Sequence, residues 1–131
     1  MAEEGPAPSA LDAPTRHEAP PVRKRWPVVA WLSCAGCIVV FLGLQNEPGL
    51  ESWEKLQKWG CYPGSAIYDG AYWALLTSVF VHLELWHVAF NVYWLWVLGR
   101  PLEEAIGSLR FLALFVGAAI ISSAAELAII G

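Results

Sequence analysis

The chain has 131 residues, of which 56% are hydrophobic and 15% are charged. Soluble domains contain roughly 45 to 50% apolar and about 25% charged residues, so this composition indicates an integral membrane protein. The net charge of -4 gives no electrostatic reason to expect a nucleic-acid partner. The lipid bilayer is therefore the first partner that we expect.

Three cysteines, Cys34, Cys37 and Cys61, cannot all pair within one chain. Two of them lie inside an apolar run and form a C-x-x-C, but neither a second cysteine pair nor a histidine lies near them in the sequence. Burial in a membrane favours inert thiols, so we expect no disulfide scaffold and no metal or redox role for this pair.

Residues 1–25 are rich in proline, carry four acidic residues and contain almost no large apolar side chain. Such a composition cannot bury enough apolar surface to order itself, so we expect a disordered cytoplasmic tail. The stretch from Pro27 to Leu44 contains no charged residue and would be about 27 Å long as a helix. This predicts a first transmembrane span at residues 26–44. A cleaved signal peptide fits less well, because the tail is long and acidic and no A-x-A site follows Leu44.

Residues 45–84 are polar and interrupted by prolines and glycines, which predicts an extracytoplasmic loop. Within it, the stretch ESWEKLQKW is typical of a short helix at the level of the lipid headgroups, where the indoles of Trp53 and Trp59 are favoured. An ordinary soluble loop is the alternative.

The stretch from Tyr72 to Leu98 contains no helix breaker and would measure about 40 Å as one helix, longer than a hydrocarbon core of about 30 Å. We therefore expect a juxtamembrane segment, YWALLTSVFVH, followed by a second span at residues 85–106. A third span is predicted at residues 109–130, where Glu126 is the only acidic residue. The predicted fold class is all-α, a polytopic membrane helix bundle with three transmembrane helices.

The basic residues indicate how these spans are oriented, because cytoplasmic loops carry an excess of lysine and arginine. Arg23, Lys24 and Arg25 precede the first span, and Arg100 and Arg110 flank the link between the second and third spans. Placing both groups in the cytoplasm puts the amino terminus inside and the carboxyl end of the chain outside.

The stretch HLELWHVAFN places two histidines and an asparagine at the start of the second span. At about 100° per residue, His87 and Asn91 lie within about 40° of each other and share one helix face. Neutral hydrogen-bonding groups inside a membrane need an oxygen-rich partner or a water-filled cavity, and a developing oxyanion would qualify. His82 lies about 140° from His87, so it cannot share this face unless the helix starts after it. We expect it to brace the loop.

Two other interpretations concern the same residues. His87 and Asn91 could join helices through interhelical hydrogen bonds worth about 0.6 to 2 kcal/mol each. A zinc site formed by His82, Glu84 and His87 is disfavoured by spacing, because the three do not fall on one helical face and no fourth ligand lies nearby. We expect neither a metal nor a cofactor.

The motif H-x-x-x-x-H-x-x-x-N lies within GAYWALLTSVFVHLELWHVAFNVYWLWVLGRPLEEAIGS, which resembles the first loop and second transmembrane helix of rhomboid intramembrane serine proteases. The resemblance extends from Trp59 to about Ser123. It implies a partial rhomboid fold in a bacterial plasma membrane, with transmembrane proteins as substrates. It also implies site residues: His87 and Asn91 would stabilise the oxyanion during peptide-bond hydrolysis, His82 would be structural, and Glu103 and Gly107 would belong to the cytoplasmic turn between spans.

Two departures from the family pattern matter. Trp73 is followed by Ala74, where rhomboids usually have arginine. This departure affects the interactions that anchor the loop but not the active centre. The family nucleophile lies in a G-x-S-G motif and its general base is a histidine on a later span, and the 131 residues contain neither. Ser122 and Ser123 lie in ISSAAE without flanking glycines, and a serine hydroxyl is a weak nucleophile without an adjacent base.

Two hypotheses follow. The chain is the amino-terminal part of a rhomboid protease and is inactive by itself, or it is a noncatalytic rhomboid-like module that binds the transmembrane helices of client proteins.

Overall fold

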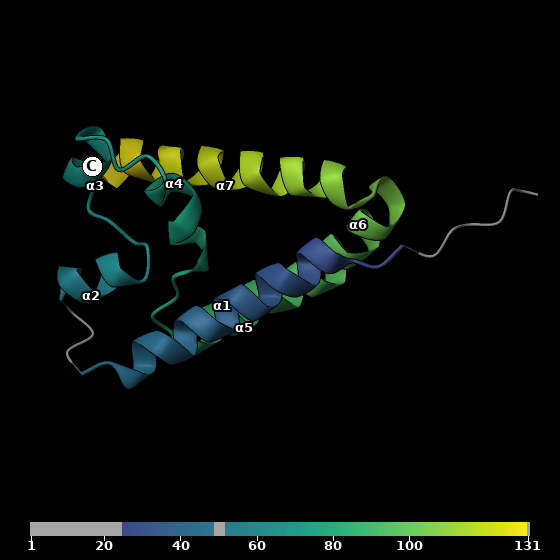
Figure 1. The fold of residues 1–131 in the computed structure, drawn as a ribbon, viewed down its shortest axis with the longest axis horizontal. Coiled ribbons are helices and arrows are strands. Elements are labelled where there is room, and N and C mark those ends of the chain that lie inside the picture. Colours follow the sequence, from purple (N-terminus) through teal and green to yellow (C-terminus); the bar gives the residue numbers. More distant parts are fainter. Residues whose placement is uncertain (1–24, 49–51, 131) are drawn as a thin grey trace, which may run out of the picture.

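The structure is a computed structural model that describes residues 25–48 and 52–130. The secondary structure within these residues is entirely helical (Figure 1), so the prediction of an all-α fold is confirmed. The predicted disordered tail lies, except for Arg25, outside the described residues. The elements in chain order are α1 (Val28–Asn46), α2 (Trp53–Lys58), α3 (Gly64–Tyr68), α4 (Ala74–Thr77), the 3-10 turn η2 (Ser78–Phe80), α5 (Leu85–Trp94), the π-helical turn η3 (Leu95–Gly99), α6 (Arg100–Ile106) and α7 (Ser108–Ile130).

Two helices are long and apolar enough to cross a membrane, α1 and α7, and each reaches a mean hydropathy of 2.1. A third candidate is the bent pair formed by Ala74–Phe80 and Leu85–Ile106, which meet at 102° and qualify only when taken together as one span. Residues 25–48 and 52–130 therefore contain two to three candidate spans, which is consistent with an all-α membrane bundle.

Helix α1 packs through its small side chains. Its buried residues Ala30, Ser33, Cys34 and Cys37 recur at the spacing of one helix face. Small residues let two helix backbones approach closely, which is how helices associate in lipid. The thiol of Cys34 donates a hydrogen bond to the carbonyl of Val92 on α5, with a sulfur-to-oxygen distance of 3.8 Å. This cysteine therefore helps to join α1 to α5.

The helices form a wedge that opens away from α6 (Figure 1). Helices α1 and α5 lie side by side, whereas α7 diverges from them along its length. The short helices α3 and α4 lie beside the carboxyl-terminal half of α7, on the open side of the wedge. The segment between α1 and α5 thus covers the open end of the bundle, opposite α6.

The two tryptophans of ESWEKLQKW have different surroundings. Trp53 is 52% exposed, whereas the Trp59 ring packs directly on α1 near its carboxyl-terminal end. A Cβ at Gly43 would lie 2.0 Å from Cη2 of Trp59, so this close approach requires glycine. The nearby ion pair between Lys58 and Glu47, with a nitrogen-to-oxygen distance of 2.5 Å, holds α2 against the end of α1 and lowers the pKa of the Glu47 carboxyl.

Candidate functional site

His82 lies in the break before α5. It is 5% exposed, and its Nδ1 lies 3.1 Å from the carbonyl oxygen of Phe80. Burial lowers the pKa of His82, because the imidazolium loses hydration, and the hydrogen bond to Phe80 opposes this shift in part. Helix α5 begins at Leu85, after His82, so the helical angle that separates His82 from His87 in a continuous helix does not apply. The two imidazole rings meet edge to face, with centroids 4.9 Å apart.

His87 is exposed on the first turn of α5. Besides the contact with His82, its ring stacks on that of Trp86, with centroids 5.4 Å apart and an interplanar angle of 24°. The imidazole is therefore held between two other rings, which restricts its rotation while leaving it accessible.

Asn91 lies one turn further along α5. Its Nδ2 donates a hydrogen bond to the carbonyl oxygen of His87 at 3.0 Å, which leaves the second N–H of the amide. Asn91 also lines a pocket of about 320 Å³ between α5 and α7, together with Cys37 of α1 and Ser122 of α7. His87 does not line this pocket. The structure thus joins His87 and Asn91 through one hydrogen bond, but their side chains meet different surroundings.

The two serines of α7 lack a catalytic base. Ser123 Oγ lies 3.3 Å from Ser78 Oγ of η2, and Ser122 lines the Asn91 pocket. Within residues 25–48 and 52–130, no histidine hydrogen-bonds to either serine. Sequence reasoning did not pair Ser78 with Ser123, because 45 residues separate them and neither belongs to a recognisable motif.

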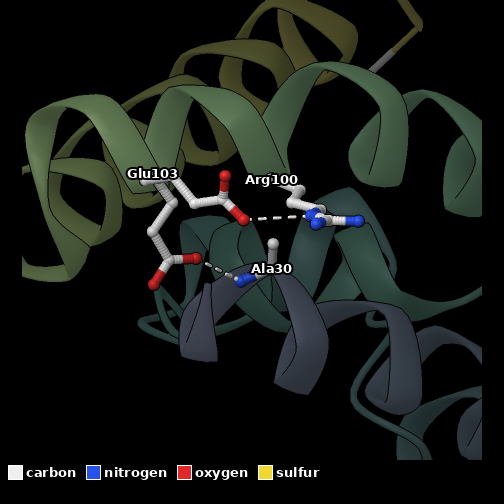
Figure 2. Close-up of polar contacts among 4 residues, drawn as sticks. Ala30, Arg100 and Glu103 are labelled. Atoms are coloured by element: carbon white, nitrogen blue, oxygen red, sulfur yellow. Dashed lines mark hydrogen bonds and ion pairs between the residues drawn. The ribbon is translucent and has the colours of Figure 1, made fainter. Parts of the chain in front are cut away.

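Glu103 has a role that the sequence did not reveal. Its side chain is completely buried, and its carboxylate accepts hydrogen bonds from the N–H of Ala30 at 2.7 Å (Figure 2) and from that of Val29 at 2.9 Å. The Ser108 hydroxyl donates a third bond at 2.5 Å. The first N–H groups of a helix have no intrahelical acceptor, and an anion there is favoured by the helix dipole. Glu103 therefore caps α1 from α6.

Gly107 ends α6. Its φ of 91° and ψ of 153° lie in a region that essentially only glycine adopts, and its N–H donates to the carbonyl of Glu103 at 2.8 Å. A Cβ here would also lie 2.3 Å from Nη1 of Arg25. The chain can therefore reverse directly into α7, which places Ser108 beside Glu103.

A metal centre is not built from the described residues: across residues 25–48 and 52–130, no three His, Cys, Asp or Glu side chains are grouped so that they could hold an ion.

These features define an α-helical integral membrane protein with a polar cluster at the start of one apolar helix. Residues 69–131 match the family model described as the Rhomboid domain. The chain is 35% identical over 100 residues to rhomboid protease GluP of Bacillus subtilis (strain 168), which covers 76% of this chain and 20% of that protein. It is 28% identical over 101 residues to rhomboid protease GlpG of Salmonella typhi, covering 77% of this chain and 35% of that protein.

The matches confirm the predicted resemblance to rhomboid proteases, which the family model places in residues 69–131. The chain spans between a fifth and about a third of the length of these relatives, 20% and 35% respectively. No solved structure matches the chain significantly.

Proposed function

We propose that this chain supplies the oxyanion side of a rhomboid-type serine peptidase centre that hydrolyses peptide bonds of transmembrane proteins. His87 and Asn91 are the donors, and His82 positions His87. Two contacts at the start of an apolar helix carry the proposal: the His82 and His87 rings pack edge to face, and the Asn91 amide donates to the backbone carbonyl of His87. Family membership supports the reaction type.

The physical argument concerns donors that are fixed before the reaction. An oxyanion is stabilised by N–H groups that need no reorganisation when charge develops. His87 is restricted by Trp86 and His82, and Asn91 is restricted by its bond to the His87 carbonyl while keeping one N–H for a ligand. Neither donor role requires a permanent charge in the membrane, because a neutral imidazole and an amide each supply an N–H.

The described residues do not form a complete catalytic centre. Ser123 is engaged with Ser78 rather than with a base, and the G-x-S-G motif of the family is absent from the 131 residues. We therefore propose that this chain expressed alone neither cleaves a transmembrane substrate nor reacts with a fluorophosphonate probe. Probe labelling that disappears in Ser123→Ala would contradict this.

The oxyanion role is tested in a chimera in which residues 69–131 replace the matching segment of the Bacillus subtilis relative. His87→Ala and Asn91→Ala should each lower kcat about ten- to a thousandfold, as expected when one oxyanion donor is lost. Leu98→Ala, which removes an exposed side chain from the same helical run, is the control and should retain activity. Undiminished turnover in both variants, or a correctly inserted chimera without activity, would count against the proposal.

A noncatalytic role in binding client transmembrane helices is the second candidate. The observation that favours it is the pocket between α5 and α7, whose wall is largely apolar but contains Asn91 and Ser122. A helix seated there would meet two hydrogen-bonding groups. A photoreactive residue at Ala118, which lines the same pocket, should then crosslink to a second membrane protein in cells, whereas one at Leu109 on the exposed start of α7 should not.

We also propose that the amino terminus and α6 lie in the cytoplasm and α2 outside, in a bacterial plasma membrane, with spans near residues 26–44, 85–106 and 109–130. The clustering of arginines near α6 supports this orientation. In a chain without native cysteines, an impermeant thiol reagent added to intact cells should modify Glu54→Cys but not Glu104→Cys. Equal modification of the two would reject the orientation.

A further inference from the structure

A small pocket lies at the end of the bundle near α6, away from His87 and Asn91. It has a volume of about 180 Å³, and its wall is assembled from the segment before α1, α1 itself, the π-helical turn and α6. Its wall contains two arginines, one glutamate, three tryptophans and a proline: Arg25, Arg100, Glu104, Trp26, Trp31, Trp96 and Pro27. Two guanidinium groups, one carboxylate and three indoles therefore surround one cavity at a single end of the membrane helices.

The indoles form one side of this pocket. The rings of Trp31 and Trp96 pack edge to face, with centroids 4.9 Å apart. Arg100 lies over the Trp96 ring, with Cζ 5.0 Å from its centroid, which holds the guanidinium by a cation–π contact. Indoles are favoured at the level of the lipid headgroups, so this wall suits the boundary between acyl chains and phosphates.

The arginines keep donors available. Arg100 uses Nε to bind Glu104 at 3.0 Å (Figure 2), and its two Nη atoms make no hydrogen bond to another described residue. Arg25, whose Nη1 lies against Gly107, forms no hydrogen bond or ion pair within the described part of the chain. The Glu103 carboxylate is not free to neutralise either arginine, because it is buried and accepts three hydrogen bonds.

We infer that this pocket binds the phosphate headgroup of an anionic phospholipid from the adjoining leaflet. Guanidinium groups match phosphate oxygens with paired donors. Basic pockets between membrane helices attract anionic lipids, and Arg23 and Lys24 precede the pocket in the sequence. A lipid fits better than a free phosphate ion, because the indoles in the wall of the pocket offer apolar surface to its glycerol and acyl chains.

The test uses the whole chain, reconstituted in phosphatidylcholine vesicles that contain a small fraction of photoactivatable phosphatidylglycerol. After irradiation and digestion, mass spectrometry should find lipid adducts concentrated in peptides that contain residues 25–31 or 96–104. Excess unlabelled phosphatidylglycerol should suppress these adducts, whereas inorganic phosphate at the same concentration should not. This measurement needs no variant.

Variants then assign the donors. Arg25→Gln combined with Arg100→Gln should reduce labelling about ten- to thirtyfold, since each cation near an anionic surface contributes a factor of about five. Arg25→Lys combined with Arg100→Lys keeps both charges and should retain most of the labelling. Arg110→Gln removes an exposed arginine at the start of α7 that does not line the pocket, and should change labelling less than about twofold.

Three results would overturn the inference: adducts spread evenly over the membrane helices, competition by inorganic phosphate as effective as that by phosphatidylglycerol, or equal losses in Arg110→Gln and the double glutamine variant. Each would show that the pocket does not select an anionic lipid.

Discussion

The Glu103 carboxylate accepts a hydrogen bond from the backbone N–H of Ala30 at 2.7 Å, across 73 residues of chain. The bond joins α6 to the first turn of α1 (Figure 2), where Pro27 has no side chain that could cap the helix. One acidic side chain therefore fixes how two apolar helices meet at the closed end of the wedge.

Glu103→Ala should destabilise the chain by about 1 to 3 kcal/mol, because two buried N–H groups lose their acceptor. Glu103→Gln should cost less, since its amide oxygen can still accept one bond. Resistance of the chain to unfolding by sodium dodecyl sulfate in mixed micelles measures both effects. Glu104→Gln, which disrupts only the partly exposed pair with Arg100, is the control and should change stability by less than about 1 kcal/mol. Equal losses at Glu103 and Glu104 would contradict the capping role.

Gly107→Ala should destabilise the turn between α6 and α7 by about 1 to 3 kcal/mol, because the native φ of 91° is strained for any residue with a Cβ. Gly117→Ala is the matched control, since this glycine lies within α7 and a Cβ there meets nothing within 4 Å. That substitution should be neutral or stabilise the helix by up to about 1 kcal/mol. The stability of each variant is measured as the midpoint temperature of its thermal unfolding in micelles. A lower midpoint for Gly117→Ala than for Gly107→Ala would contradict the role of Gly107 in the turn.

Gly43→Ala should displace the Trp59 ring, because the added Cβ would lie 2.0 Å from its Cη2. Overpacking of this kind costs about 1 to 3 kcal/mol. Gly36→Ala is a milder control, since its Cβ would lie 3.2 Å from the Phe80 ring. Tryptophan emission, recorded in chains that retain Trp59 as the only tryptophan, should shift to longer wavelength in Gly43→Ala and stay unchanged in Gly36→Ala.

The stability of the chain should fall on acidification from pH 7.5 to pH 5. Burial lowers the pKa of His82 below the value of about 6.5 that it has in the unfolded chain, so the fold favours neutral imidazole. Neutral His82 therefore contributes to stability at pH values above the pKa that it has in the unfolded chain. This contribution is lost as the pH falls through the lower pKa that His82 has in the folded chain. His82→Gln should flatten that part of the profile, whereas His17→Gln, outside the described residues, should not. An unchanged slope in His82→Gln would show that another group is responsible.

Glu126→Gln should make Cys61 more reactive toward alkylation at pH 8. Burial, and to a lesser extent the negative charge of Glu126, raise the pKa of the Cys61 thiol, and only the second cause is removed. The thiolate fraction should therefore rise by less than about tenfold, which is the effect of one full pKa unit. The measurement is made with Cys34 and Cys37 replaced by serine. Membrane insertion and protein level should not change, because Glu126 is exposed near a helix end.

Much of the fold could be read from the sequence, because membrane helices depend on local composition. The absence of charge in α1 and the apolar length of α7 indicate helices that satisfy their own backbone hydrogen bonds in lipid. The spacing of His87 and Asn91 likewise follows from helix geometry alone, and both lie on α5. The family motif is also a local property of the chain, which is why its resemblance to rhomboids was evident before any contact was known.

Contacts between distant residues were decided only by the tertiary structure. The resemblance to rhomboids implied that Glu103 belongs to the turn between spans, whereas it lies in α6, just before that turn. Whether its carboxylate meets water or the start of α1 depends on how α1 packs against α6. In the same way, the pairing of Ser78 with Ser123 and the position of Trp59 on Gly43 require segments that are far apart in the chain. Periodicity reports which side chains share a helix face, whereas it contains no information about the neighbour that this face meets. The sequence by itself therefore determined the helices and their candidate chemistry, and packing between helices determined which polar groups have partners.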